Sequence, residues 1–504
     1  MIDNLAHPSL RLRGIVPPMA VAAAALVLVA GATLAAPSSP PLFVACAVAL
    51  VVLSAIAAIR WPRTAIVLVA LSPIVDRYIV ADLLPAEIAS ASHFLSEALL
   101  LTVAVILAGR AWIEGRLIAV FRHPVTLALV AFTAIAALSA AVNGVPPHVA
   151  LIGIVFTIDA AALFFLPLLV GFSLRQALAA IGIIGGIVTV AAVLAIGQAL
   201  LAPRLFGMVP YRGRFGEEVR LASIFGDPNV LGAFLVFTIP FALVAAARLS
   251  DRRLRWLAGG IGFVLLLALW LSFSRGSWIA LVVGVGMMLA IVDRRALVIG
   301  LLAAVLSFGT AIYMPRNLMV PDQPRPNIVD STRDRIGAIG VGGDLRTLFV
   351  LQSIPIIRDH PLIGVGPGRF GGAVAHTFPT PLYDEYGFRP LFWNPAQRTV
   401  DNFWLHLLVE TGILGVAAFL AAAFIPGVRI VRAARRAIGW RRVALAGIAA
   451  ATTGLAVSSG TTMLLEANSI GFVFWLLLGL GALVVAAVPA ADRALPEGDA
   501  SAAG

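Results

Sequence analysis

The chain has 504 residues, of which 61% are hydrophobic and 12% are charged, and its mean hydropathy is +1.00. A soluble globular protein is nearer 45–50% apolar and about 25% charged, so this composition excludes the soluble class and indicates a polytopic membrane protein. The formal net charge is +11, but in such a chain the location of the charges says more than their sum. The single cysteine, Cys46, excludes a disulfide framework and a thiolate metal cluster.

Apolar runs of about 20 residues, the length that crosses a bilayer, predict an all-α bundle of about fourteen transmembrane helices. They are expected at residues 15–36, 41–59, 64–77, 91–109, 124–142, 149–172, 177–201, 229–247, 255–273, 276–292, 296–313, 402–426, 443–460 and 467–489.

Arginine placement orients this bundle. Arginines recur in every second connection, and short connections such as 37–40 and 143–148 carry none. Because basic residues accumulate in short cytoplasmic loops, this alternation predicts that both termini are cytoplasmic. The apolar run after Arg11 and Arg13 is expected to be a retained first helix. Two long loops, residues 202–228 and 314–400, then face outward; they are called the first and second long loops below.

The first long loop leads directly into a membrane helix. Asp227 or Asn229 is expected to cap that helix and Pro228 to open it, which is an alternative to a role in a site. Arg220 requires an anionic partner beside the membrane surface.

The next outward turn is Ser274-Arg275-Gly276, where two apolar runs meet. Arg275 is either an interfacial anchor or a cavity residue that joins an anion site.

The second long loop is polar and is expected to contain short amphipathic helices. Apolar residues at 345, 348, 349, 351 and 354 predict a helix that carries Arg346 and lies against the bundle. Pro361, directly after His360, is expected to end it, and a glycine-rich turn follows.

Asp401 and Asn402 stand at the outer mouth of the helix that follows this loop. His406 and Glu410 lie four residues apart on one face of that helix, at or just inside the membrane. Ionisable groups at that depth are costly and are candidates for function. The alternatives are that Asp401 is a helix cap and that His406 and Glu410 make a structural contact.

Over residues 205–420 the sequence resembles the bacterial O-antigen ligase and O-antigen polymerase family, which consists of polytopic glycosyltransferases of the GT-C-like class. The elements that carry the resemblance are Arg220 with Asp227-Pro228-Asn229, Ser274-Arg275-Gly276, Arg346 with Asp359 to Gly368, Asp401-Asn402, and Glu410-x-Gly412-x-x-Gly415.

The resemblance implies transfer of a glycan from an undecaprenyl-diphosphate carrier on the periplasmic face of the bacterial inner membrane. It implies that Arg220 and Arg346, with Arg275 as a further candidate, bind the pyrophosphate. Family ligases have a histidine as general base where this chain has Asp401. A carboxylate can also accept a proton, so this departure favours a polymerase or another branch of the family. His406, one turn further, is the alternative base. Asp227, Asn229, His360 and Glu410 are expected to support the site.

No cofactor and no metal are expected. The long loops lack an Asp-x-Asp motif and are rich in arginine, and guanidinium groups can stabilise a diphosphate in place of a divalent ion. The expected partners are the lipid-linked donor, a glycan or lipid A core acceptor, and a chain-length regulator. Three parts are expected: N-terminal helices (1–201), a family core with the site (202–428), and C-terminal helices with a cytoplasmic tail (429–504).

Two other functions fit a bundle of this kind. A flippase for lipid-linked oligosaccharides is the main alternative, although transporters tend to place charges at the membrane midplane and to have short loops. A cell-wall glycan polymerase is the second. The sequence leaves open the sugar, the linkage, the acceptor and the choice between polymerase and ligase.

Overall fold

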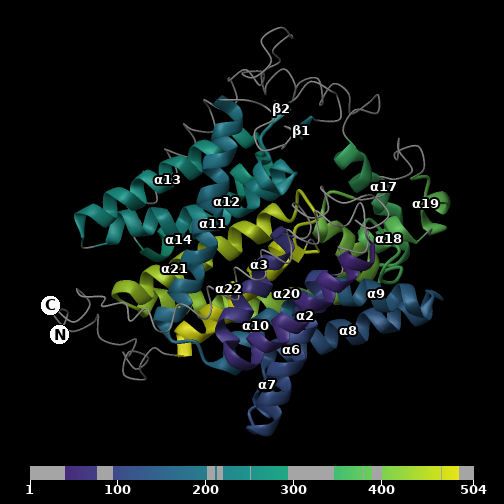
Figure 1. The fold of residues 1–504 in the computed structure, drawn as a ribbon. Helices are drawn as coiled ribbons and strands as arrows, with labels where there is room; N and C mark the ends of the chain where they lie inside the picture. The colour runs from purple at the N-terminus through teal and green to yellow at the C-terminus, as the bar shows by residue number, and fades with distance from the viewer. Residues whose placement is uncertain are drawn as a thin grey trace, which may run out of the picture. The chain divides into compact units, whose positions relative to one another are not determined.

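The computed structural model describes residues 40–75, 95–200, 211–212, 219–249, 251–292, 345–378, 380–388, 400–466 and 468–486 (Figure 1). The chain divides into two compact units, Met1–Leu117 and Ile118–Gly504. The three parts expected from the sequence were defined by motif content, and that division stays a prediction.

The first unit contains helices α2 (Pro40–Arg60), α3 (Pro62–Val75) and α6 (Leu95–Ile113), which pack on one another. Small residues such as Ala58 and Ala70 are fully buried in this unit, and small residues let helix backbones approach closely. The Ser72 hydroxyl donates a hydrogen bond to the Ser96 hydroxyl over 3.1 Å and joins α3 to α6.

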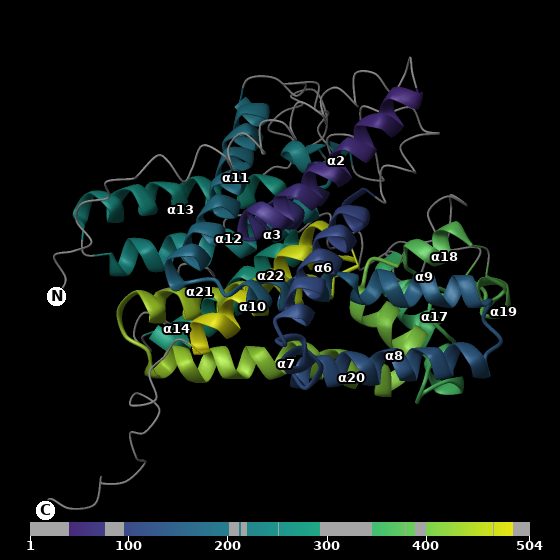
Figure 2. The same cartoon turned by 60° about the horizontal axis from the view of Figure 1, so that its bottom comes forward.

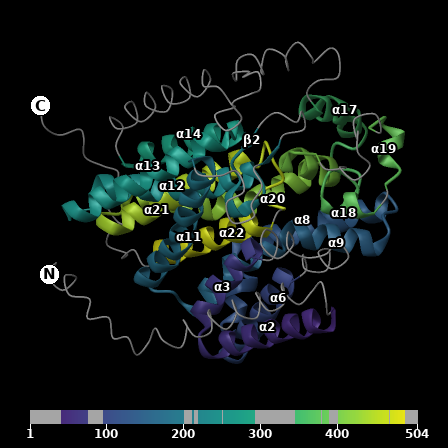
Figure 3. The same cartoon turned by 45° about the horizontal axis from the view of Figure 1, so that its top comes forward.

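The second unit holds most of the chain. After α7 (Leu117–Phe121), its bundle is formed by α8 (Pro124–Val142), α9 (Pro147–Ile158), α10 (Ala162–Val170), α11 (Leu174–Leu200), α12 (Pro228–Arg248), α13 (Arg252–Ser272), α14 (Arg275–Val292), α20 (Phe403–Arg436), α21 (Gly439–Ser458) and α22 (Asn468–Ala486). The short 3₁₀ turn η4 (Asp159–Ala161) joins α9 to α10. Its core surrounds α22, whose Phe472, Trp475 and Leu476 are fully buried against α10, α20 and α21. Beside this core, α12, α13, α14 and α21 lie side by side (Figure 3).

Eight helices among the described residues are long and apolar enough to cross a membrane, and three shorter apolar helices accompany them. The all-α polytopic membrane class predicted from composition is therefore confirmed. Each span predicted within the described ranges coincides with helix to within a few residues, apart from α20, which continues ten residues beyond its predicted end. The predicted spans 15–36 and 296–313 lie outside the described residues, so the number of about fourteen stays a prediction.

The first long loop ends in local structure that prepares the start of α12. Strands β1 (Tyr211–Arg212) and β2 (Val219–Arg220) form an antiparallel pair in which Arg220 is opposite Tyr211. The 3₁₀ turn η6 (Ser223–Phe225) follows. Asp227 then caps α12 by accepting hydrogen bonds from the Asn229 and Val230 backbone N–H groups, and Pro228 opens the helix. The expectation of an Asp cap followed by an opening proline is confirmed.

The second long loop contains three helices: α17 (Leu345–Asp359), α18 (Ala373–Thr377) and α19 (Leu382–Glu385). They gather over the first turns of α20 and the ends of α8 and α9 (Figure 2). The predicted end of the first of these helices, just before Pro361, is confirmed.

The buried face of α17 differs from the prediction that Leu351 and Ile354 lie against the bundle. Phe349 and Ile356 are buried, whereas Leu351 and Ile354 point outward with Val350 and are 51% and 37% exposed. Packing on Phe370, Phe388 and Leu405 selects the buried face, and an apolar strip remains on the other side.

Helix α20 is broken at Gly412, which has a φ of 63° and a ψ of −173°. Residues 361–366 of the second long loop fill the break. The backbone N–H groups of Val365 and Gly366 donate to the carbonyl groups of Val409 and Glu410, each over 2.9 Å. On the far side of the break, Ile413 and Leu414 donate to the carbonyl groups of Pro361 and Leu362 over 3.0 and 3.1 Å.

This exchange supplies partners for backbone groups that a continuous helix would have bonded internally. Unpaired backbone groups are expensive in an apolar surrounding. Two glycines permit the close approach: a Cβ atom on Gly364 would lie 2.5 Å from the Val409 oxygen, and one on Gly412 would overlap the Leu362 carbonyl group. Asn143 of the α8–α9 turn adds a hydrogen bond of 3.0 Å to the Gly364 oxygen. The glycine-rich motif is therefore the structural connection between the second long loop and α20.

Candidate functional site

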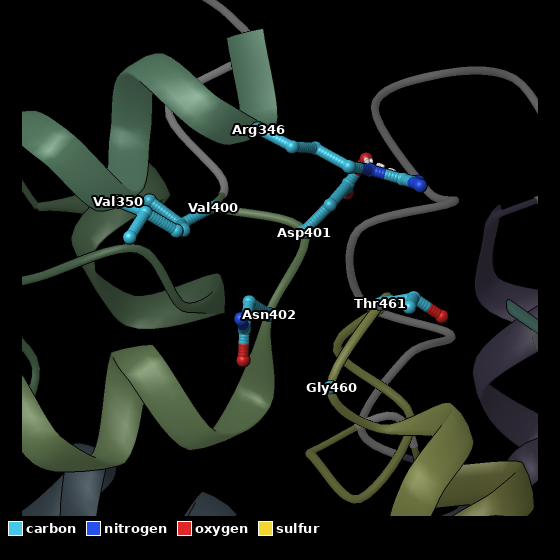
Figure 4. A pocket seen from close by; sticks show the side chains of 7 residues that line it. All are labelled: Arg346, Val350, Val400, Asp401, Asn402, Gly460 and Thr461. Carbon is cyan, nitrogen blue, oxygen red and sulfur yellow. Dashed lines mark hydrogen bonds and ion pairs between the residues drawn. The ribbon is translucent and has the colours of Figure 1, made fainter. Parts of the chain in front are cut away.

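A pocket of about 330 Å³ lies where the second long loop meets the start of α20 (Figure 4). It is lined by Arg346, Val350, Val400, Asp401, Asn402, Gly460 and Thr461. Arg346 and Val350 come from α17, one turn apart, and Asp401 and Asn402 precede α20. Gly460 and Thr461 come from the connection between α21 and α22, residues 459–467, and form a separate wall.

Arg346 and Asp401 are paired at this pocket. The Arg346 Nη2 and Nε atoms donate to the Asp401 Oδ2 atom over 3.1 and 3.4 Å. Their side chains are 46% and 51% exposed, so the pair is open to solvent and contributes little to stability. A cation and a carboxylate that are 55 positions apart in sequence therefore meet at one cavity, where they could contact a ligand that carries anionic and hydroxyl groups.

Asn402, and not Asp401, caps α20. The Asn402 side chain accepts a hydrogen bond from the Leu405 backbone N–H over 3.1 Å, as an N-cap residue does. The alternative that Asp401 is the helix cap is therefore wrong, because Asn402 is the N-cap residue. The Asp401 carboxylate is directed to the pocket instead.

His406 and Glu410, in the first turns of α20, form a buried cluster. Both residues are almost inaccessible, at 3% and 2%, and neither lines the pocket. The His406 Nε2 atom lies 3.7 Å from the Glu410 Oε2 atom. The His406 Nδ1 atom contacts the Phe370 carbonyl oxygen, and the Glu410 Oε1 atom accepts a hydrogen bond from the Phe370 backbone N–H over 2.8 Å. Both side chains thus hold the turn of residues 370–373 against α20.

Two further side chains, which sequence reasoning missed, bind the same turn. The Tyr383 hydroxyl accepts a hydrogen bond from the Gly371 N–H over 2.8 Å, and the Glu466 Oε1 atom accepts one from the Ala373 N–H over 2.8 Å. One signal for Glu466 was available: it is the single acidic residue between Glu410 and Asp492. Tyr383 had no signal, because its partner is a backbone group that sequence does not reveal.

The Ser274-Arg275-Gly276 turn packs against Thr461, which lines the pocket. The Ser274 hydroxyl donates to the Asn229 Oδ1 atom over 3.0 Å and joins the starts of α12 and α14. A Cβ atom on Gly276 would overlap the Thr461 side chain, so a glycine there lets α14 approach that wall. Arg275 is half-buried at the first position of α14.

The remaining candidates occupy different positions. Arg220 lies in strand β2, in the segment before α12. His360 is half-buried just after α17, and its carbonyl oxygen accepts a hydrogen bond from Gly364 over 3.1 Å. Asp359, beside it, accepts a hydrogen bond of 2.8 Å from the Tyr386 hydroxyl. Burial and then this bond raise the pKa of Tyr386 to about 12, so the phenol keeps the proton that it donates.

No group of three His, Cys, Asp or Glu side chains in the described ranges has an arrangement that could hold a metal ion. Metal independence stays a prediction, since it depends on the chemistry of the bound donor.

Comparison with known proteins gives one family match. A family model described as O-Antigen ligase matches residues 260–420. The match covers the Ser274-Arg275-Gly276 turn, α17, the glycine-rich motif and the start of α20, and it leaves Arg220, Asp227 and Glu466 outside. No curated protein matches the chain.

Proposed function

We propose that this chain, whose residues 260–420 match a family model described as O-Antigen ligase, transfers a glycan from a polyprenyl-diphosphate carrier to an acceptor hydroxyl at the Arg346–Asp401 pocket. A glycan-transferring role of the ligase or polymerase type follows from the family. The finer assignment is supported by one observation: the accessible guanidinium and carboxylate groups meet at a single cavity.

In the proposed reaction, Arg346 binds the diphosphate of the donor and leaves its resting contact with Asp401. Asp401 accepts the proton of the acceptor hydroxyl, and that oxygen forms a bond to the anomeric carbon. The bond from this carbon to the diphosphate breaks, and its electron pair stays on the phosphate oxygen. Arg346 stabilises this charge, which is the task of an electrostatic catalyst, and we propose that no metal is needed. Arg220 and Arg275 are further candidates for the same anion.

The apolar strip of α17 supports a lipid-linked donor. Val350 lines the pocket one turn from Arg346, and the exposed Leu351 and Ile354 continue away from it. A ligand with a charged diphosphate and a long apolar chain matches a cation followed by an apolar helix face. We therefore propose that the isoprenoid chain runs along this strip and into the membrane.

Asp401 at the position of the ligase histidine favours a polymerase, whose acceptor is a second lipid-linked glycan. The ligase alternative has a lipid A core acceptor. The two are distinguished by the lipid-linked glycans that accumulate after gene deletion: long chains on the carrier indicate a missing ligase, and single repeats indicate a missing polymerase.

Transfer is tested directly with purified protein in liposomes. The donor is supplied only on the leaflet that carries the second long loop, together with an acceptor glycan. Formation of a longer glycan supports the proposal. Movement of the donor across the bilayer without any new glycosidic bond would instead indicate a flippase.

We expect Arg346→Ala to lower kcat/KM about ten- to hundred-fold, because a charge-assisted contact to phosphate contributes ~1.5–3 kcal/mol. Arg346→Lys should restore only part of the loss, since lysine cannot bind a phosphate through two parallel N–H groups. Arg358→Lys is the matched control, because Arg358 is exposed at the other end of α17. Full activity of a folded Arg346→Ala protein would remove this residue from the donor site.

We expect the second long loop to be periplasmic and the C-terminal end of α20 to be cytoplasmic. In a Cys46→Ala background, a cysteine at the exposed Glu385 should react with an impermeant maleimide in intact cells. A cysteine at Ile438, which is 82% exposed, should react only after permeabilisation. The opposite pattern would reverse the topology and place the pocket on the cytoplasmic face.

A further inference from the structure

The two walls of the pocket belong to parts of the chain that are far apart in sequence. One wall is Arg346 and Val350 of α17 together with residues 400–402, and the other is Gly460 and Thr461. A reaction that needs contacts from both walls requires them to keep a constant separation, because small displacements of reacting groups are costly.

Glu466 lies in the same connection as Thr461 and reaches the second long loop. Its Oε1 atom accepts the 2.8 Å hydrogen bond from the N–H of Ala373, the first residue of α18. The approach is close enough to require glycine at the preceding position: a Cβ atom on Gly372 would lie 2.5 Å from Glu466 Oε1 and 2.8 Å from His406 Cε1.

The turn that Glu466 binds is itself bonded to the segment that carries Asp401. The Val400 N–H donates to the Gly371 carbonyl oxygen over 2.9 Å, and Asp401 follows directly. A continuous path therefore runs from Glu466 through the backbone of residues 371–373 to Val400 and Asp401. Tyr383, His406 and Glu410 contact the backbone of Phe370 and Gly371 in the same turn.

We propose that Glu466 is a positioning residue that holds the 460–461 wall of the pocket in register with the wall that carries Arg346 and Asp401. Glu466 itself does not line the pocket, so it acts through the Ala373 N–H and Val400, in addition to the direct hydrogen bond of 2.9 Å from the Phe403 N–H to the Ser459 carbonyl oxygen beside the two walls. Its effect on catalysis rests on the proposed function, whereas its effect on the distance between the walls does not.

The test measures that distance directly. In the Cys46→Ala background, spin labels at Arg358→Cys on α17 and Met463→Cys in the α21–α22 connection report the separation of the two walls by pulsed electron paramagnetic resonance. Glu466→Ala removes the acceptor, and Glu466→Gln keeps an acceptor oxygen without the charge. Ala373→Pro removes the donor from the other side: proline is tolerated at the first position of a helix, and Gly372 has a ψ of −175°, which suits a residue before proline.

We expect a narrow distance distribution in the labelled parent and in Glu466→Gln, and a broadened one in both Glu466→Ala and Ala373→Pro. The double variant should be no broader than either single variant, because both remove the same bond. Glu385→Ala, which removes an exposed carboxylate of the same loop, should leave the distribution narrow. A distribution in Glu466→Ala that is as narrow as the parent's, or additive broadening in the double variant, overturns the proposal.

In the liposome assay, Glu466→Ala should lower kcat about 10- to 100-fold, the size expected when a change away from the reacting atoms displaces them. Glu466→Gln should restore most of the rate, and this rescue separates positioning from proton transfer, which Gln cannot perform. If the distance distribution broadens but the parent transfers no glycan, the positioning role stands and the proposed function fails. If the rate of Glu466→Gln is as low as that of Glu466→Ala, the carboxylate itself takes part in the chemistry and the positioning role is wrong.

Discussion

Asp401→Asn is expected to lower the rate of glycan transfer by ~10²–10⁴ while leaving the fold unchanged, because a lost general base costs about that much. The substitution isolates the proton-accepting function. The cap of α20 is made by Asn402, so the variant removes no cap, and the amide retains the shape of the carboxylate. The measurement is single-turnover transfer with donor-loaded liposomes, which separates chemistry from product release.

His406→Gln is the comparison for Asp401→Asn. His406 is buried and outside the pocket, in contact with Phe370 and Glu410, so we expect its replacement to lower stability more than the rate of the folded fraction. An active Asp401→Asn protein beside an inactive but folded His406→Gln protein would assign the base to the imidazole. If both variants stay active, neither residue is the general base, and the reaction would depend on arginine promoting the departure of the diphosphate.

Gly412→Ala is expected to prevent accumulation of folded protein. A backbone with a φ of 63° and a ψ of −173° is essentially restricted to glycine and strains other residues by about 1–3 kcal/mol. The new Cβ atom would also overlap the Leu362 carbonyl group and displace the chain that fills the break. Four backbone hydrogen bonds cross this junction, and each buried group left unpaired costs about 1–3 kcal/mol more. The measurement is the thermal transition in detergent, followed by size-exclusion fluorescence.

Gly427→Ala is the matched control, because Gly427 lies in the same helix and a Cβ atom there would meet no other atom within 4 Å. It should be neutral or stabilising by about 0.5–1 kcal/mol, since alanine favours a helix over glycine. A Gly412→Ala protein as stable as Gly427→Ala would mean that α20 can run without its break and that residues 361–366 are not held there.

The helices could be predicted from the sequence because their determinants are local. An apolar run of membrane-spanning length has no other way to satisfy its backbone in a bilayer. The start of α12 follows from Asp227 and Pro228, and the end of α17 follows from Pro361, since caps and prolines act within one turn. The candidates Arg346 and Asp401 came from the resemblance to the O-antigen ligase and polymerase family, since their positions match its motifs.

The tertiary structure decided how those residues are combined. From the sequence, Asp401 was the candidate for the cap, and only the backbone geometry at the start of α20 shows that Asn402 is the cap. The apolar run from Phe403 continues through Gly412 without interruption, and the break there depends on the insertion of residues 361–366, about 50 positions earlier along the chain. Glu466 and Ala373 are 93 positions apart. Because the donor is a backbone N–H, which every residue except proline has, the sequence around Ala373 does not reveal that Glu466 binds there. Composition and local signals thus determined the class of the protein and where most of its helices begin and end, but not the end of α20 or its break at Gly412. Which polar groups share one pocket was set by long-range packing, because contacts between distant segments depend on the folded backbone and leave no periodic trace in the sequence.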